Sequence, residues 1–388
     1  MASQAPLIIV GGGLAGSLAA LMLAERRPEL PLLLLEAGET FGGNHTWSFF
    51  DSDVPRTATA LVAALQPVIW PRHVVRFITR ERVLPFGYNS VCAPSLDALV
   101  RSRLGPHAAR LDVAVQQLEA DGVILSSGQR IAASGVIDAR GPDRETSGLE
   151  LGWQKFVGIE FACAASEPDC ATVMDATVPQ LDGYRFVYVL PLAADRVLVE
   201  DTYYSNGPEL DVALIADRVR HLARERGLAG KELRQETGVL PILIGGDPGA
   251  FWPANDPIAR LGLRGGFFHA TTGYSFGLAL QQAEALAAFA GPFDSHTLAR
   301  LTRARFLEHW RRTGFFRLLN RLMFHAADPA QRHRIFAHFY RLPPQVIQRF
   351  YAGRPTIADR IRILSGRPPV PLSTALTVLL RLHKGGRT

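Results

Sequence analysis

The chain has 388 residues, of which 47% are hydrophobic and 20% are charged. This composition is typical of a globular protein with room for two full hydrophobic cores. No run of eighteen apolar residues lacks charges or helix breakers, which argues against a membrane-spanning helix. Cys92, Cys163 and Cys170 lack metal-ligand spacing, and so small and odd a set indicates a reducing compartment without disulfides. We therefore expect no metal site.

The net charge of +6 is unevenly distributed. Residues 297–388 contain 18 Lys+Arg and 3 Asp+Glu, so this segment carries +15 and the rest of the chain carries −9. Nucleic acid, an anionic membrane surface and an acidic protein are the partners that such a segment can attract. The segment contains no nucleic-acid recognition motif, so we do not expect a nucleic-acid partner.

The first forty residues have the order of a dinucleotide-binding unit. An apolar run at 7–10 precedes a glycine motif, an alanine- and leucine-rich stretch follows, and a second apolar run at 32–35 ends on Glu36. This pattern predicts strand, tight turn, helix, strand and acid. The motif reads Gly11-Gly12-Gly13-Leu14-Ala15-Gly16.

Each part of this unit has a physical role. Gly11 permits the turn, Gly13 lets the backbone approach a pyrophosphate, and Gly16 lets the helix pack closely on the strand. The first helical N–H groups and the helix dipole face the anion. Glu36 is placed to accept a hydrogen bond from a ribose 2′-hydroxyl, which favours FAD or NAD over NADP. The alternatives are an ordinary glycine-rich turn and a signal peptide, and the missing basic flank argues against the latter.

The loop that follows Glu36 mixes turn formers with polar and aromatic side chains. It lies beyond the carboxyl end of a parallel strand, where doubly wound sheets bind ligands. We expect His45 and Trp47 to form a wall of the cofactor or substrate site. A simple capping loop is the alternative.

The next segment combines short helices and strands. Ser95 is predicted to cap a helix at 96–104, and the strand before Gly141 is predicted to return the backbone to the bound cofactor. Residues 1–40 and 95–142 would then form one domain with an insertion between them. The other predicted elements are a helix at 58–66, strands at 68–72 and 74–79, a turn at 85–90 and hairpins over 111–131.

From 155 to 205 the pattern predicts an antiparallel sheet, with a hairpin that pairs 184–190 with 197–204. Residues 233–246 are predicted to form a further strand and a turn. Glu200 shares a strand face with Leu198 and Thr202, whereas Asp201 points to the opposite face. Only one of these two acids can therefore face a given cavity. The alternative is a polar strand end that faces solvent.

The last part of the chain contains a second glycine-rich loop and a basic helical region. The loop at 265–277 precedes a helix at 278–290 and offers another place for N–H groups to meet a ligand, at Gly273, Tyr274 and Ser275. Two such loops far apart in sequence indicate one extended ligand such as FAD. Further helices are predicted from 297 onwards, with Phe315, Leu318, Leu319, Leu322 and Met323 on one apolar face and a final helical piece at 372–382.

These motifs resemble those of the bacterial-type lycopene β-cyclases, which are flavoproteins of carotenoid synthesis. The resemblance covers most of the chain, and its more specific parts are the GGNHTW and EDTYY stretches. The matching segments are 11–16 with Glu36, 42–49, 185–192, 199–204 and 265–275.

The resemblance implies a reaction without net redox change. The acyclic ψ-end of lycopene is protonated at C2, C1 closes onto C6, and a proton is lost from C6 to leave a β-ionone ring. The product series is lycopene, γ-carotene and β-carotene, and related acyclic carotenoids are further possible substrates. FAD is needed in its reduced form but is not consumed, with NAD(P)H as the external reductant.

The residues support this chemistry independently. Protonation of an alkene requires a strong acid shielded from water, and a carboxyl group on an apolar strand can be held protonated by desolvation. Glu200 is our first candidate, as acid or carboxylate stabiliser, and Asp201 the second, as hydrogen-bond orienter. His45 and His269 sit in glycine loops near the predicted flavin, and structural roles are favoured for both, although His45 is retained among the cofactor-contacting residues.

The expected fold is α/β. The resemblance implies a Rossmann-like FAD-binding domain of the p-hydroxybenzoate hydroxylase and geranylgeranyl reductase type. An antiparallel-sheet substrate domain and a C-terminal helical region complete the expected fold. The expected segments are 1–50, 90–150 and 255–292 for the FAD-binding domain, 51–89 and 151–254 for the substrate domain, and 293–388 for the helical region.

The basic C-terminal region is expected to bind a membrane surface, because lycopene must be taken from a bilayer. We expect a cytoplasmic protein, peripherally associated with the inner face of the membrane. A solvated helical face is the alternative. The rival functions are a flavin-dependent monooxygenase or prenyl reductase, which would consume NAD(P)H, and a non-enzymatic carotenoid- or flavin-binding protein.

Overall fold

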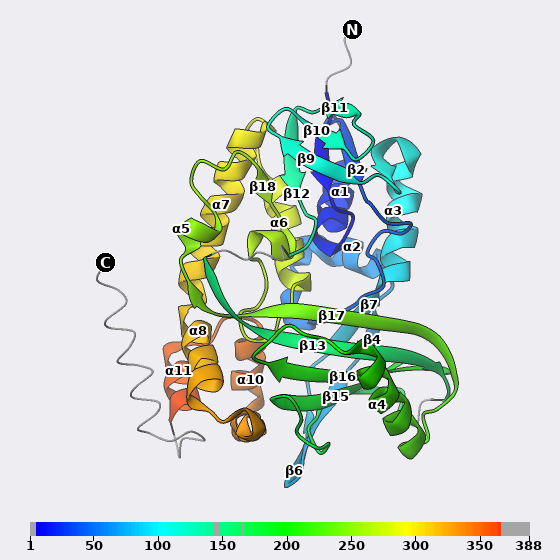
Figure 1. Cartoon of the computed structure of the whole chain (residues 1–388), viewed down its shortest axis with the longest axis vertical. Helices are drawn as coiled ribbons and strands as arrows, with labels where there is room; N and C mark the ends of the chain where they lie inside the picture. The colour runs from blue at the N-terminus through cyan, green and yellow to red at the C-terminus, as the bar shows by residue number, and fades with distance from the viewer. Residues whose placement is uncertain (1–4, 143–147, 165–166, 366–388) are drawn as a thin grey trace.

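The computed structural model describes residues 5–142, 148–164 and 167–365. A parallel sheet with helices forms one half of the molecule, and a larger, mostly antiparallel sheet forms the other (Figure 1). The C-terminal helices run along one side of both halves.

The parallel sheet is built from short apolar runs that are distant in sequence. Its strand order is β18-β12-β1-β2-β8, and residues buried on both faces are typical of parallel strands. The bounds are Leu7–Val10 for β1, Leu32–Leu35 for β2, Ala109–Arg110 for β8, Gly135–Asp138 for β12 and Ala259–Arg260 for β18.

The two faces of this sheet are covered differently. Helices α1 (Leu14–Arg26), α3 (Ala93–Ala108) and α6 (Phe276–Ala287) pack with Leu7 and Ile9 on one face. Ile8 and Val10 face a three-stranded sheet on the other. That sheet consists of β9 (Val115–Glu119), β10 (Gly122–Leu125) and β11 (Arg130–Ala132).

The large sheet has the order β17-β13-β16-β15-β14-β5-β6. Its pairs are antiparallel except for β14 with β5. The hairpin predicted over 184–204 is present as β15 and β16, and the turn predicted at the end of 233–246 is wrong, because β17 continues through it. The bounds are Arg72–Phe77 for β5, Arg80–Leu84 for β6, Leu149–Ala162 for β13, Cys170–Asp175 for β14, Tyr184–Ala193 for β15, Arg196–Ser205 for β16 and Lys231–Gly246 for β17.

The large sheet has an aliphatic face and an aromatic face. Helix α4 (Val212–Glu225) packs on the first, over Val157 and Val199. The second carries Phe186 and Tyr204, which contact C-terminal segments. Because side chains alternate along a strand, successive residues of β16 belong to these two environments.

A third sheet of three strands lies between the two halves. It consists of β3 (Thr46–Phe50), β7 (Tyr88–Cys92) and β4 (Val68–Trp70), with α2 (Thr59–Ala64) nearby. The turn predicted at 85–90 is therefore partly wrong, because β7 begins at Tyr88 and pairs with both neighbours. Cys92, not Ser95, is the N-cap of α3.

The C-terminal helices do not form a separate layer. Helix α7 contacts β12 and β18 of the parallel sheet, and α8 contacts β17 of the large sheet. The bounds are Ser295–Arg312 for α7, Gly314–Arg321 for α8, His333–Phe339 for α9, Pro344–Tyr351 for α10 and Ile357–Leu364 for α11, and the short α5 covers Pro248–Phe251.

The apolar face predicted around 315–323 is only partly correct. Met323 is buried, but the buried residues of α8 are Phe316 and Asn320. The amide nitrogen of Asn320 donates to the Leu243 and Ala270 carbonyls, so a polar residue occupies the buried face. A π-helical turn at Leu322–Ala326 then breaks the regular periodicity. The helix predicted at 372–382 lies outside the described residues.

Candidate active site

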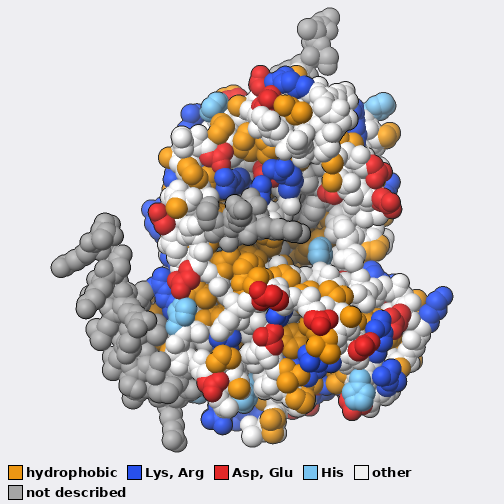
Figure 2. Space-filling model, in the orientation of Figure 1, with side chains coloured by type: hydrophobic (Ala, Val, Ile, Leu, Met, Phe, Trp, Pro, Cys, Tyr) orange, Lys and Arg blue, Asp and Glu red, His pale blue; other side chains and the backbone are white. Residues whose placement is uncertain are grey.

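One cavity of about 790 Å³ lies between the parallel sheet and the aromatic face of the large sheet. Its walls come from the glycine motif, the loop before β3, strands β13, β15, β16 and β17, and the loop before α6. In Figure 2 hydrophobic side chains gather in the hollow between the two halves of the molecule. The cavity therefore joins a dinucleotide-type cradle to an apolar chamber.

The glycine motif has the geometry that a bound pyrophosphate requires. A Cβ on Gly16 would lie 2.0 Å from the Gly11 carbonyl oxygen, so α1 can approach β1 only with glycine there. Gly11 has a φ of +104°, which glycine adopts without strain. Gly13 caps α1 and has no atom within 4 Å of its Cβ position, so it faces open space. The predicted roles of these glycines agree with this geometry.

Glu36 is fixed by the backbone at the end of β2. Its Oε2 accepts a hydrogen bond from Gly12 N at 2.6 Å, and its Oε1 accepts one from Gly38 N at 2.8 Å. Each carboxylate oxygen has two lone pairs, so the group can still accept a bond from a ribose hydroxyl. The side chain lines the cavity beside the cradle.

Most residues predicted to contact the cofactor line this one cavity. Gly12 and Gly16 are the exceptions, because they lie against Phe41 and Gly11 and shape the turn. Those that line it are Gly11, Gly13, Leu14, Ala15, Glu36, His45, Gly141, Gly273, Tyr274 and Ser275.

The two histidines have different environments. His45 lines the cavity, and burial lowers its pKa. His269 is buried, with Nε2 3.1 Å from the Phe350 carbonyl oxygen and Nδ1 3.2 Å from Thr272 N. Burial lowers the pKa of His269 to about 4, so the ring is neutral. His269 therefore holds its loop in shape, as the sequence favoured.

Two buried polar atoms in the cavity wall have no hydrogen-bond partner among the described residues. They are Oε1 of Gln154 on β13 and Oγ1 of Thr272 in the loop before α6. Buried polar atoms are rarely left unpaired in native proteins. Together with the open space at Gly13, they fit an extended ligand with polar ring atoms, such as a flavin dinucleotide.

Glu200 reaches the cavity from the middle of the large sheet. It lies on β16 with Leu198, which also lines the cavity, and Thr202 Oγ1 donates to Glu200 Oε1 at 2.7 Å. Burial is the largest cause of a pKa raised well above the usual 4.5, and the neighbouring Glu236 carboxyl raises it further. Burial in the cavity therefore favours the neutral form of this carboxyl group, and the side chain faces the cavity, as the alternation along the strand predicted.

Glu236 on β17 is a cavity residue that sequence reasoning missed. Its side chain is 1% exposed, and its Oε2 accepts hydrogen bonds from Arg234 Nη1 at 2.7 Å and Thr46 Oγ1 at 2.8 Å. The strand containing it was predicted, but its partner across the sheet was not. Alternation from the cavity-lining Gly238 and Leu240 is the signal that could have placed it on this face.

The loop before β3 is attached to β17 by several hydrogen bonds. Arg234 Nη1 donates to the Asn44 carbonyl oxygen at 2.8 Å, and its Nη2 donates to Thr46 Oγ1 at 2.8 Å. Asn44 Nδ2 in turn donates to the Gln235 carbonyl oxygen at 2.8 Å. We call residues 44–46 and 234–236 the clasp, because they join the dinucleotide-binding half to the large sheet.

Three tyrosine hydroxyls meet in the cavity wall. Tyr88 OH lies 3.1 Å and Tyr188 OH 3.4 Å from Tyr274 OH. Trp47 and Phe276 line the same cavity. Electron-rich aromatic faces and hydroxyl oxygens can stabilise a passing cation without forming a bond to it. Tyr88 escaped prediction because its strand was interpreted as a turn.

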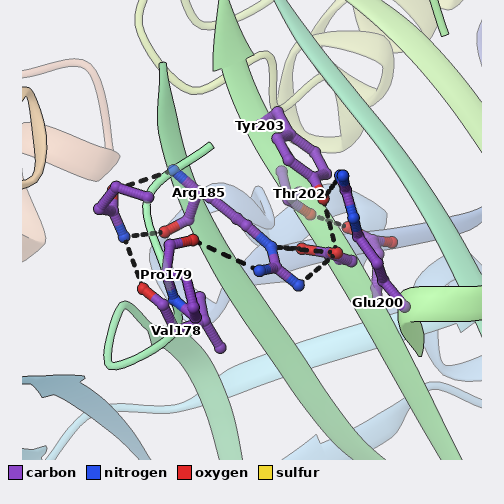
Figure 3. A network of polar contacts seen from close by, with 9 residues as sticks. Val178, Pro179, Arg185, Glu200, Thr202 and Tyr203 are labelled. Atoms are coloured by element: carbon purple, nitrogen blue, oxygen red, sulfur yellow. Dashed lines mark hydrogen bonds and ion pairs between the residues drawn. The ribbon is translucent and has the colours of Figure 1, made fainter. Parts of the chain in front are cut away.

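Asp201 does not line the cavity, which agrees with its predicted position on the strand face opposite Glu200. It is fully buried on the aliphatic face of the sheet, where Arg185 Nε and Nη2 each donate to it at 2.8 Å. Tyr203 OH donates to the same carboxylate at 2.7 Å. Figure 3 shows Arg185 directed at the strand that carries Glu200, Thr202 and Tyr203. Side chains alternate between the two faces of the sheet along β16, which explains why Glu200 faces the cavity and Asp201 faces the aliphatic core.

Comparison with known proteins identifies the family. The family model described as "Lycopene cyclase protein" matches residues 6–377. The chain is 41% identical to lycopene beta-cyclase of Pantoea ananas over 386 residues, covering 97% of this chain and 98% of that one. The chain belongs to the lycopene cyclase family. This lycopene cyclase is also 43% identical to lycopene beta-cyclase of Pseudescherichia vulneris, over 95% of each chain.

Solved structures support the fold of this lycopene cyclase. A flavin-dependent brominase, Bmp2, aligns with a TM-score of 0.60 and 12% identity, over 99% of this chain and all of that one. A geranylgeranyl bacteriochlorophyll reductase-like protein from Thermoplasma acidophilum aligns with a TM-score of 0.59 and 12% identity, over 98% and 99%. At this identity the likeness concerns the fold, and it confirms the expected α/β class.

Proposed function

We propose that this chain is a lycopene β-cyclase that works by acid-initiated cation chemistry. The observation that supports the proposal is the position of the Glu200 carboxyl, which lies in a chamber continuous with a dinucleotide cradle, where burial raises its pKa. A desolvated carboxylic acid can protonate an alkene while water, which would capture the cation, is excluded.

The proposed steps balance in atoms and charge. Glu200 gives its proton to C2 of the ψ-end, which leaves a cation at C1 and a carboxylate on Glu200. The C5–C6 π electrons form the C1–C6 bond, the positive charge moves to C5, and loss of the C6 proton restores a double bond. One proton enters and one leaves, so no oxidant or reductant is consumed.

The cavity residues assist these steps by position and charge. The hydroxyls of Tyr88, Tyr188 and Tyr274 and the ring of Trp47 line the chamber, where they offer electron density to the cation. The ionised Glu200 then opposes the positive charge at short range. Leu190, Leu198 and Phe156 keep the chamber apolar.

The cradle is proposed to hold FAD. Gly13 and the first turn of α1 would face the pyrophosphate, and Glu36 the ribose. The reduced flavin would supply negative charge near the cation, with NAD(P)H as the external source of electrons.

Replacing Gly13 by alanine tests the cradle. The substitution places a methyl group in open space, so the variant is expected to fold normally. It should bind FAD at least about tenfold more weakly, which corresponds to a loss of about 1.4 kcal/mol of binding free energy. Fluorescence titration of the apoprotein measures this.

The proposal is tested with lycopene in liposomes, the purified protein and reduced FAD under anaerobic conditions in D2O. We expect cyclised products with deuterium in the ring, separated by chromatography and examined by mass spectrometry. Unchanged lycopene, from protein shown to bind reduced flavin, would refute the cyclase activity. NAD(P)H consumed in proportion to product would instead indicate a monooxygenase or prenyl reductase.

Peripheral membrane binding is the second part of the proposal. No helix among the described residues is long and apolar enough to cross a membrane. Helix α11 does present apolar side chains to solvent, since Ile357, Ile361 and Leu364 are 76%, 64% and 50% exposed. They occupy positions i, i+4 and i+7 of one helical face, and Arg360 and Arg362 lie beside them along the helix. Such a helix suits an anionic membrane surface.

Liposome flotation tests this surface. Replacing both Ile357 and Ile361 by glutamate is expected to lower binding to anionic liposomes by about tenfold or more, because apolar area is lost and charge repulsion is gained. Leu214→Glu on α4, where the leucine is 48% exposed, is the matched control and should change little. Equal losses in the two variants would contradict the assignment of α11.

A further inference from the structure

Two carboxyl groups from different strands meet in the cavity. Strand β13 lies between β16 and β17, and its residue Gly158 is the register partner of Glu200 on one side and of Glu236 on the other. Paired residues share a sheet face, so both acids project into the chamber. Both side chains line the cavity, and besides burial, the charge and hydrogen bonding of the Glu236 carboxyl raise the pKa of Glu200.

Gly158 makes this meeting possible. A Cβ at this position would lie 3.1 Å from Cγ of Glu236 and 3.4 Å from Cβ of Glu200. The distance to Glu236 is short for a methyl group, and a larger side chain would meet both acids. The backbone of the middle strand therefore leaves a gap that the two outer glutamates fill.

The two acids have different hydrogen-bond partners. Glu236 accepts hydrogen bonds from the Arg234 guanidinium at 2.7 Å and from the Thr46 hydroxyl at 2.8 Å, so its carboxyl group lies beside a cation. Glu200 receives a hydrogen bond from the neutral Thr202 hydroxyl. Two like charges this close cannot both persist in an apolar site, so one proton is retained between them.

We propose that Glu236 is the positioning residue of the cyclase: its carboxylate accepts the hydrogen bond of the Glu200 carboxyl and keeps that proton on Glu200, aimed into the chamber. This inference rests on the proposed function and deepens it. The pair gives one proton to C2 of the substrate and, in its doubly ionised form, faces the cation. The proton released from C6 restores the singly protonated pair.

Other charged and titratable groups interact electrostatically with Glu200 or Glu236. Arg234 is the cation that neutralises Glu236, and it also contacts Glu160 at 3.2 Å. The remaining groups that interact electrostatically with one or other member are His45, Tyr88, Cys92, Tyr188 and Asp201.

The test compares Glu236→Gln with Glu160→Gln. Glu160 is 5% exposed and paired with the same Arg234, but it does not line the cavity, so it is a matched control. In Glu236→Gln the repulsion that keeps Glu200 protonated is removed. The alkaline limb of its kcat–pH profile is expected to move to lower pH by about one unit or more, with kcat at neutral pH reduced by about tenfold or more. Glu160→Gln should leave the limb in place.

A conservative variant separates charge from shape. Glu236→Asp keeps the charge on a side chain one methylene shorter, so its alkaline limb should lie between those of the wild type and Glu236→Gln. A purely structural role would instead lower activity in both variants without moving the limb. An unmoved limb in folded Glu236→Gln, or an equal shift in Glu160→Gln, would overturn the proposal.

Infrared difference titration of the protein without lycopene provides a readout independent of turnover. The carbonyl band of a protonated carboxyl should disappear in Glu200→Gln and titrate at lower pH in Glu236→Gln. If the wild type shows this band but does not cyclise lycopene, the proposed function fails and the pair stands. If the wild type cyclises lycopene and the carbonyl band of Glu236→Gln titrates at the same pH as that of the wild type, the proposed role of Glu236 fails and the proposed function stands.

Discussion

Glu200 and Asp201 are adjacent on β16, yet they occupy opposite electrostatic environments. Glu200 faces the cavity beside a second carboxyl group. Asp201 faces the aliphatic core, where Arg185 binds it with two nitrogens and Tyr203 adds a hydroxyl. The same side-chain chemistry thus provides a carboxyl group with a raised pKa on one face of the sheet and an ion pair on the other. What surrounds each carboxyl group, more than its burial, determines which role it has.

The largest expected effect comes from replacing Glu200 by glutamine. The variant keeps the shape of the side chain but removes the transferable proton, so turnover should fall by about 10²–10⁴-fold. Flavin binding should be retained, because no part of the cradle changes. Anaerobic product analysis beside a flavin titration measures both quantities. Full activity in Glu200→Gln would remove this residue from the mechanism.

Asp201→Asn is expected to act on stability. The substitution leaves Arg185, which is 6% exposed, without its counterion, and breaking a buried pair in this way costs about 3–5 kcal/mol. Urea unfolding measures the loss. Replacing Arg185 by methionine together with Asp201 by leucine should recover much of it, since both charges are then absent.

The two acids are also expected to differ in their effect on turnover. Any Asp201→Asn protein that remains folded should retain its turnover per folded molecule, because the residue does not reach the cavity. A variant with normal stability but lost turnover would place Asp201 in the reaction, and the two acids would then share one role.

A smaller effect is expected in the pH dependence of stability. The pKa of Glu200 is raised in the folded protein, so the folded state holds this proton more tightly than the unfolded state does. Stability from this group is therefore lost as pH rises above 4.5 towards the raised pKa, at about 1.4 kcal/mol for each pH unit. Glu200→Gln lacks this contribution, so its stability relative to the wild type should increase over that interval. Urea unfolding at several pH values tests the sign.

The strand, turn and helix of the glycine motif could be predicted from the sequence, because their signals are local. Gly11, Gly13 and Glu36 follow from strand, turn and helix patterns within forty residues. The convergence of Gly141 and Gly273 on the same cavity also follows, since the carboxyl ends of parallel strands meet at one edge of a sheet. Glu200 was found because alternation along a single strand separates it from Asp201.

The residues that escaped prediction depend on contacts between distant segments. Glu236 gains its role from the register of three strands around Gly158, and no pattern within β17 specifies that register. Tyr88 follows Gly87 in a stretch rich in turn formers, and only pairing with β3 and β4 makes it a strand residue. The apolar stripe at 315–323 was misjudged because the π-helical turn and the buried Asn320 interrupt it.

The clasp also constrains how a long polyene gains access to the chamber. Four hydrogen bonds join the loop at 44–46 to β17 next to Glu236, and Arg234 donates two of them. A wide opening of one half of the molecule against the other would break these bonds and uncover the acid at the same time. A long polyene is therefore expected to enter the chamber end-first while the clasp stays intact, so that the rest of its length remains outside the chamber.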